Sequence, residues 1–135
     1  MLTKRQRRFL QIARETSLES TVRRIRIGSI IVIGNKIIAT GMNQTKSHPD
    51  QAKLNVLRFD DDGKCKHFLH AEMNSLLKCQ HMDLTRAKMY IYRESKDGTI
   101  RMCRPCNACM QKIKECGIRE IFYTTNDGYA HEYIK

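Results

Sequence analysis

Two short stretches of the sequence contain the residue types that bind a transition metal and move protons. The first is His70-Ala71-Glu72, and the second is Pro105-Cys106-Asn107-Ala108-Cys109. Imidazole nitrogen and thiolate sulfur are ligands that Zn²⁺ prefers in proteins. Cys106 and Cys109 are three residues apart, so on a helix both sulfurs lie on one face and reach a single ion. The residue types and spacing therefore predict a zinc site made by His70, Cys106 and Cys109.

The number of ligands predicts what such a site does. Three protein ligands leave the fourth tetrahedral position of zinc open for water, which is typical of catalytic sites. Side chains two residues apart on a regular helix point in different directions. For His70 and Glu72 to act together, the ion must therefore lie beyond the start of their helix. Glu72 is then expected to carry protons as a general acid and base without being a ligand.

Other interpretations of the cysteines explain less of the pattern. A structural zinc site uses four protein ligands, and a zinc ribbon needs a second C-x-x-C pair, which the sequence lacks. Cys103 extends the pair to C-x-x-C-x-x-C, as at the start of a ferredoxin cluster motif, but Ile113 stands where that motif continues with cysteine. A thioredoxin-like redox pair of Cys106 and Cys109 leaves the first motif unexplained.

The elements around the motifs predict an α/β domain. Apolar periodicity, β-branched runs and turn residues predict helices over 3–17, 70–80 and 106–116, and strands over 27–33, 36–40, 87–92 and 118–124. Pro105 is expected in the first turn of its helix, and Gly117 ends that helix. Helical crossovers favour parallel pairing, whereas the opening hairpin is antiparallel, so the sheet should be mixed.

The segment 44–69 has no clear period, and such a long irregular segment is usually a functional loop. We expect it to border the active site. A second metal site made from His48, Cys65 and His67 is conceivable there, although scattered ligands in a polar loop are more often idle.

Length and composition restrict the setting. The 135 residues fit a single domain over 1–135, and no apolar run is long enough to cross a bilayer. The basic N-terminus lacks the apolar run of a signal peptide, so we expect a soluble protein of the cytoplasm, or of the host cytoplasm if phage-encoded, with its six cysteines as thiols. The net charge of +11 predicts attraction to anions, and nucleic acid, nucleotide phosphates and acidic lipid head groups are the candidates. Charge alone does not distinguish between them.

H-x-E followed by P-C-x-x-C is the signature of zinc deaminases, and the chain resembles the cytidine and deoxycytidylate deaminase superfamily over most of its length. It looks nearest to the deoxycytidylate branch, including small versions encoded by bacteriophages. The resemblance rests on both motifs and on the segments 26–32, 37–43, 70–76 and 117–118. It implies a three-layer α/β/α fold with a mixed, about five-stranded sheet, for which 127–134 is the stretch left to form the fifth strand, although a short helix or an extended arm is as plausible there.

The resemblance also implies roles for individual residues. His70, Cys106 and Cys109 take the ligand positions, Glu72 the proton shuttle, and Asn43 a contact with the nucleoside, with Ala71 also among the substrate-binding residues. A nucleotide phosphate needs one or two nearby cations, which are expected from the following set: Arg26, Lys46 and Arg104. Two features depart from the family pattern, namely Arg104 where relatives often carry Ser or Glu, and the segment 44–69.

The implied reaction is zinc-dependent hydrolytic deamination of a cytosine nucleotide, dCMP to dUMP, by a homo-oligomer without a membrane partner. One alternative is a deaminase acting on cytosine or adenine within single-stranded DNA or RNA, including tRNA. A further alternative is a basic zinc module that binds nucleic acid without catalysis. The free nucleotide is favoured because the basic residues are dispersed, Trp is absent, and the tyrosines do not alternate with Arg or Lys as on a stacking platform.

Overall fold

The computed structural model describes residues 2–22, 25–45 and 69–134. Its elements, in chain order, are α1 (Lys4–Ser17), β1 (Arg26–Ile33), β2 (Lys36–Met42), α3 (Ala71–Leu77), β3 (Ala87–Glu94), α4 (Asn107–Glu115), β4 (Glu120–Thr124) and β5 (Tyr129–Tyr133). Each helix and strand predicted from the sequence is present, within a few residues at its ends. No described helix is long and apolar enough to span a membrane.

The five strands form one mixed sheet in the order β2-β1-β3-β4-β5. β1 pairs antiparallel with both β2 and β3, β3 pairs parallel with β4, and β4 pairs antiparallel with β5. The turn between β1 and β2 consists of Gly34 and Asn35, and Gly34 has a φ of 62°, which glycine adopts without strain. The mixed sheet and its opening hairpin are therefore confirmed, and the tail forms the fifth strand as an extended edge.

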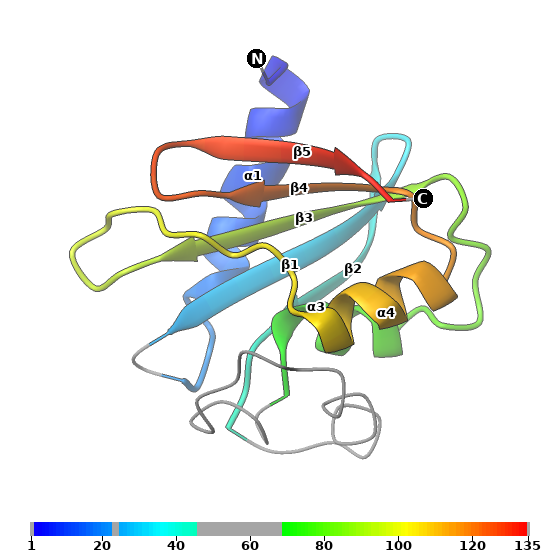
Figure 1. Cartoon of the computed structure of the whole chain (residues 1–135), viewed down its shortest axis with the longest axis horizontal. Helices are drawn as coiled ribbons and strands as arrows, with labels where there is room; N and C mark the ends of the chain where they lie inside the picture. Colours follow the sequence, from blue (N-terminus) through cyan, green and yellow to red (C-terminus); the bar gives the residue numbers. More distant parts are fainter. Residues whose placement is uncertain (1, 23–24, 46–68, 135) are drawn as a thin grey trace.

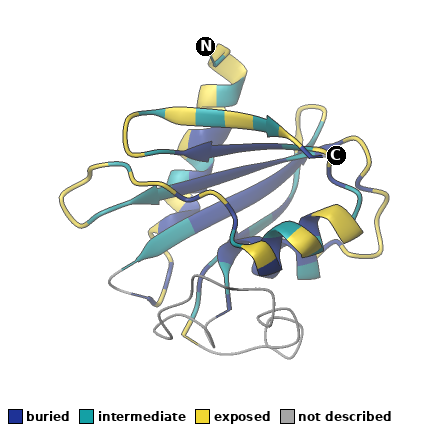
Figure 2. Cartoon of the chain, viewed as in Figure 1, coloured by how far each residue is buried: buried dark blue, intermediate teal, exposed yellow. Residues whose placement is uncertain are grey.

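Helices cover both faces of this sheet (Figure 1). α1 crosses one face and buries an apolar cluster that includes Phe9, Tyr90 and Phe122. α3 and α4 lie side by side on the opposite face, above a second cluster that includes Leu76 and Ile113. The central strands are consequently buried on both faces, whereas β5 is partly exposed (Figure 2). The predicted three-layer α/β/α architecture is confirmed.

The two helices beyond the sheet's second face begin one residue later than the sequence predicted. His70 and Cys106 are N-cap residues with extended backbones, at φ −76°, ψ 153° and φ −67°, ψ 169° respectively. Pro105 therefore precedes the N-cap of α4, and its expected place in the first helical turn is wrong. α3 also ends at Leu77, earlier than position 80, and β4 begins at Glu120, later than position 118. Propensity does not distinguish a cap from a first helical residue, because the two differ only in backbone angles.

Candidate active site

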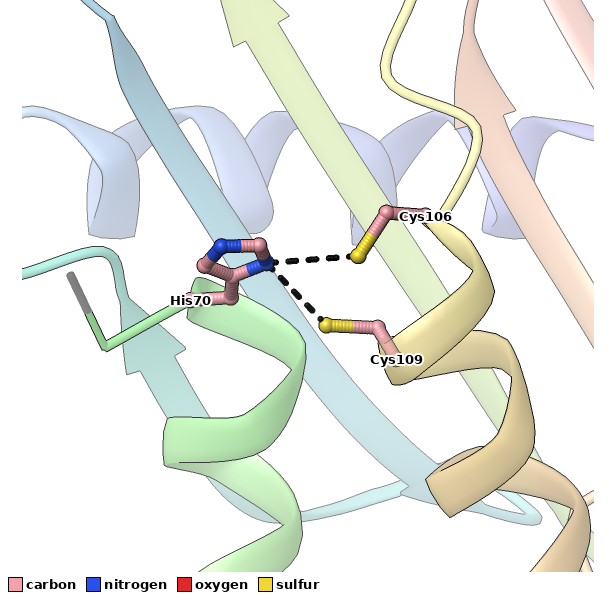
Figure 3. Close-up of side chains that lie close together, drawn as sticks. All are labelled: His70, Cys106 and Cys109. Atoms are coloured by element: carbon pink, nitrogen blue, oxygen red, sulfur yellow. Dashed lines mark hydrogen bonds between the residues drawn. The ribbon is translucent and has the colours of Figure 1, made fainter. Parts of the chain in front are cut away.

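The two predicted motifs meet at the N-terminal ends of α3 and α4 (Figure 3). His70 Nδ1 lies 3.5 Å from Cys106 Sγ and 3.3 Å from Cys109 Sγ. The ligand atoms of all three residues lie within 4.8 Å of one another. Residues 36 and 39 positions apart in the chain thus point toward one common centre.

This spacing fits a tetrahedral zinc ion. With Zn–S bonds of about 2.3 Å and Zn–N bonds of about 2.0 Å, a nitrogen and a sulfur bound to the same ion lie about 3.5 Å apart. Both measured nitrogen-to-sulfur distances agree with that edge length. The donor set of one imidazole and two thiols also suits zinc and leaves one position free of protein ligands. Because Nδ1 faces the sulfurs, a neutral imidazole that binds metal here carries its proton on Nε2.

The start of α4 favours the ionised form of the cysteines. Cys106 is the N-cap and Cys109 the third residue of the helix, so both thiols lie where the positive end of the helix dipole stabilises a thiolate. The hydrogen bond with Cys109 and the contact with His70 hold the pKa of the Cys106 thiol well below its ordinary value. Since zinc binds thiolate and not thiol, this arrangement prepares the pair for the metal.

Glu72 lies in the first turn of α3 and is 5% exposed. Burial raises the pKa of its carboxyl above the ordinary value, against the opposing effects of His70 and of a hydrogen bond with Cys109. Its interactions with all three candidate ligands place the carboxyl beside the cluster. A buried carboxyl with a raised pKa keeps its proton to a higher pH than an exposed one, which suits a general acid and base.

A small-residue contact positions α3 over the sheet. A Cβ added to Gly41 would lie 2.5 Å from the Ser75 backbone nitrogen and 2.6 Å from the Ala71 carbonyl oxygen, so only glycine allows this approach. Beside it in the sheet, the buried Ser29 hydroxyl is 2.8 Å from the Ala71 carbonyl and 2.7 Å from the Ser75 hydroxyl. These contacts hold the first turn of α3, and hence the residues on either side of Ala71, in place.

Ser29 and Ser75 were not identified as site-supporting residues from the sequence. Ser29 stands in a run of apolar β-branched residues, where a polar side chain signals a buried hydrogen bond. That signal was available, but its partner could be known only once the helix was placed on the strand.

Comparison with protein families gives one assignment, which covers both motifs and the strands β1 to β4. The model of the cytidine and deoxycytidylate deaminase zinc-binding region matches residues 3–125. The chain belongs to this family. The zinc-binding description and the His70, Cys106 and Cys109 group together confirm Zn²⁺ as the predicted cofactor.

Three curated relatives of this deaminase family member match most of the chain, and two of them are named as deoxycytidylate deaminases. A probable deoxycytidylate deaminase of Caenorhabditis elegans is 28% identical over 128 residues, which cover 91% of this chain and 58% of that protein. ComE operon protein 2 of Bacillus subtilis is 29% identical over 128 residues, with 94% and 62% covered. The chain thus spans about 60% of the length of these two relatives. The deoxycytidylate deaminase of Mycobacterium phage D29 is 27% identical, with 85% of this chain and 90% of the phage protein covered.

Solved structures show the same fold in other deaminases. The apo dCMP deaminase of cyanophage S-TIM5 superposes with a TM-score of 0.63 at 21% identity, with 93% of this chain and 86% of that chain covered. The cytidine deaminase of Burkholderia pseudomallei gives a TM-score of 0.66 at 14% identity, with 98% and 93% covered. The likeness at these identities concerns the fold and confirms the cytidine deaminase-like architecture.

In this family member, Asn43 is held tightly at the end of β2. Its Oδ1 accepts hydrogen bonds from the Ser20 hydroxyl at 2.5 Å and the Ile27 amide at 3.0 Å, and its Nδ2 donates to the Ile25 carbonyl at 2.5 Å. The side chain is therefore oriented by the chain itself and keeps a second amide hydrogen for a further acceptor. A contact between Asn43 and a nucleoside stays a prediction, as does a contact with Ala71, which is fully buried.

The predicted phosphate-binding cations have different surroundings. Strand alternation places Arg26 on the α1 face of β1, because Ile27 and Ile31 pack on the other face, where α3 and α4 lie. Arg104 forms an ion pair with Glu132, with Nε and Nη2 at 2.7 and 3.1 Å from the two carboxylate oxygens. Lys46 lies outside the described residues. The structure thus brings neither Arg26 nor Arg104 into the cluster as an unpaired cation.

Cys103, the other cysteine of the C-x-x-C-x-x-C pattern, is not part of the zinc-binding set. Cys103 is buried, with its sulfur 3.0 Å from Thr124 Oγ1 and 3.4 Å from the Ile91 carbonyl, and burial raises the pKa of its thiol to about 12. It is therefore a neutral thiol and does not join the three-residue cluster. The five described cysteines form no disulfide with one another, as predicted. The conceivable second site of His48, Cys65 and His67 lies outside the described residues.

Proposed function

We propose that this chain is a zinc-dependent hydrolase that converts dCMP and water to dUMP and ammonia. The observation that carries the proposal is the buried carboxyl of Glu72 beside a three-residue zinc-binding set. A structural zinc site has no need of an acid with a raised pKa next to a metal that keeps one position free of protein ligands. Family membership supports the same reaction class.

The residues divide the work of a hydrolytic deamination. When zinc is bound, it supplies a Lewis acid that lowers the pKa of water and so makes it a nucleophile at neutral pH. Glu72 accepts the proton that this water releases and delivers it to the cytosine ring nitrogen. The water oxygen bonds to C4 of the ring, and Glu72 then moves the second water proton to the exocyclic amine, so that the C4–N bond breaks, the C4 carbonyl forms and ammonia leaves. His70, Cys106 and Cys109 hold the metal, and Asn43 orients the nucleoside through its remaining amide hydrogen.

A free nucleotide is the substrate that the available observations favour. The phage relative is named a deoxycytidylate deaminase, and a solved structure of the cyanophage enzyme is in complex with dCMP and dUMP. A base within a polynucleotide must be flipped or presented unpaired, usually on an aromatic platform along a basic groove. No Trp is present in the chain, and its net charge of +11 reports general attraction to anions more than site chemistry.

A deamination panel tests the reaction and the substrate together. Ammonia release is measured at fixed salt from the following compounds: dCMP, cytidine, dCTP, guanine, single-stranded DNA and tRNA. We expect dCMP to have the highest kcat/KM. Turnover confined to a polynucleotide would contradict the substrate, whereas absence of turnover from every compound by zinc-loaded protein would contradict the enzyme.

Glu72→Gln is the matched variant for the proton-transfer role. It keeps the shape of the side chain but cannot exchange protons, so we expect a fall in kcat of about 10²- to 10⁴-fold. Zinc content and Tm should stay close to those of the unaltered protein, because Glu72 is not a ligand. Loss of zinc in this variant would show that the assigned role is wrong.

We further propose that the protein works as a homo-oligomer, as the family resemblance implies. Mass measurement in solution tests this over a range of concentrations. Monomer alone at the highest concentration would contradict it.

A further inference from the structure

Arg93 is a cation at the end of β3 that the sequence motifs do not include. Tyr90 and Tyr92 belong to the apolar cluster under α1, whereas Met89 and Ile91 belong to the cluster under α3 and α4. Because side chains alternate along a strand, Arg93 shares the second face with Met89 and Ile91. It therefore lies on the side of the sheet that carries the zinc-binding residues.

The surroundings of Arg93 place it near the reaction centre. It follows Tyr92 at the carboxyl end of β3, next to the carboxyl end of the parallel strand β4, where α/β sheets bind their ligands. Its amide donates to Thr124 Oγ1 at 3.2 Å, which joins these two strand ends. The buried thiol of Cys103 interacts electrostatically with both Glu72 and Arg93.

The guanidinium of Arg93 is anchored but has no acidic partner among the described residues. Nη1 donates to the Met102 carbonyl at 3.3 Å, and the described residues offer it no ion pair. Arg14 and Arg104, by comparison, each bind a carboxylate. Arg93 as a residue is half-buried, and a guanidinium with one hydrogen bond to a carbonyl retains several N–H donors in a planar fork. That fork matches the oxygens of a phosphate monoester.

The three cations expected from the sequence to bind the phosphate do not provide an unpaired cation at the site among the described residues. Arg26 is on the other face of β1, Arg104 is paired with Glu132, and Lys46 is not described. We propose that Arg93 binds the 5′-phosphate of the nucleotide and so selects the nucleotide over the nucleoside. This inference rests on the proposed deaminase site, because it specifies which part of that substrate Arg93 contacts.

Product binding tests Arg93 without relying on turnover. Calorimetry compares dUMP with deoxyuridine on zinc-loaded protein, for the unaltered chain, for Arg93→Gln and for Arg93→Lys. We expect Arg93→Gln to weaken dUMP binding by about 10- to 100-fold, as for the loss of a charge-assisted hydrogen bond, and so to reduce the preference for dUMP over deoxyuridine. Arg93→Lys should restore part of that preference, because the charge returns without the fork.

Arg101→Gln is the matched control. Arg101 is an exposed neighbour on the same hairpin, and its charge interacts with Asp97. Arg101→Gln changes the net charge by the same amount as Arg93→Gln. An equal loss of dUMP binding in both variants would therefore indicate general electrostatic attraction and overturn the proposal. Unchanged dUMP binding by Arg93→Gln, or no preference for dUMP in the unaltered protein, would also overturn it. Failure of the reaction itself is separate, because it appears as tight dUMP binding without ammonia release from dCMP.

Discussion

The two faces of the sheet differ in the kinds of side chain that they bury. On the α1 face, aromatic rings stack from strand to strand, with Tyr90 and Phe122 centroids 4.5 Å apart and an angle of 6° between their planes. On the opposite face, near α3, the chain buries Ser29, Ser75 and Glu72 among apolar residues. Burying such groups is unfavourable unless they are hydrogen-bonded, so this face combines a large apolar cluster with hydrogen bonds that fix the positions of the buried polar groups. Both sides of the sheet thus contribute apolar packing, whereas the candidate catalytic groups lie on one side.

The largest effect should come from removing the metal ligands on the α3 and α4 face. Replacing Cys106 and Cys109 together with Ser removes both thiolates, which dominate the affinity for zinc. We expect less than about half an equivalent of zinc by metal analysis, and no measurable deamination. The serine pair keeps the size of the side chains, so near-ultraviolet circular dichroism shows whether the fold persists. Full retention of zinc would contradict the assignment of Cys106 and Cys109 as zinc ligands.

A core substitution on the α1 face should affect stability without affecting chemistry. Phe122 is fully buried, and Phe122→Ala leaves a cavity in the aromatic stack. We expect a decrease of about 3–5 kcal/mol in the free energy of unfolding, measured with denaturant. Below the lowered Tm, zinc content and kcat should stay close to the original values. Loss of zinc from folded Phe122→Ala protein would show that the two faces are coupled.

Ser29→Ala should have a smaller effect on stability but a detectable one on turnover. The substitution removes the hydrogen bonds to the Ala71 carbonyl and the Ser75 hydroxyl. We expect a loss of about 1–2 kcal/mol in stability, because two buried hydrogen bonds are lost while the Ser75 hydroxyl keeps its bond to the Glu72 carbonyl. The first turn of α3 carries Glu72, so kcat should also fall. Thr16→Ala is a comparison on the α1 side, since it also removes a hydroxyl hydrogen bond, here to Ile12, and kcat should stay unchanged.

The smallest effect concerns the ion pair of Arg104 and Glu132. Hydrogen bonds from Arg104 and Tyr123 lower the pKa of the Glu132 carboxyl below its ordinary value of 4.5. A lowered pKa in the folded state stabilises the protein above pH 4.5, and this contribution is lost as the pH falls through the lowered pKa. Glu132→Gln should therefore reduce Tm slightly at pH 7, and the difference should shrink in acid.

Glu19→Gln serves as the control for that small effect. Glu19 is exposed, and its side chain forms no ion pair with a described residue. The substitution removes the same charge without removing a partner. A similar pH-dependent difference in both variants would assign the effect to net charge and not to the ion pair.

The sequence by itself determined the candidate site residues more completely than the contacts between side chains. His70, Glu72, Cys106 and Cys109 were identifiable because zinc chemistry restricts residue types and spacing. The element order was also readable, because apolar periodicity and turn residues act within a few positions of the chain. The mixed sheet with helices on both faces followed from that order and from the family resemblance.

Only the tertiary structure decided which charges are available to a ligand. Arg26 and Arg93 lie opposite Glu94 and Ile27 in neighbouring strands, yet alternation directs them to different faces. Arg104 is paired with Glu132, which is 28 residues away, and that contact exists only because β5 adds to the sheet edge. The meeting of His70 with Cys106 and Cys109 likewise depends on how the two helices approach each other. Such properties are set by neighbours distant in the chain, for which local sequence contains no signal.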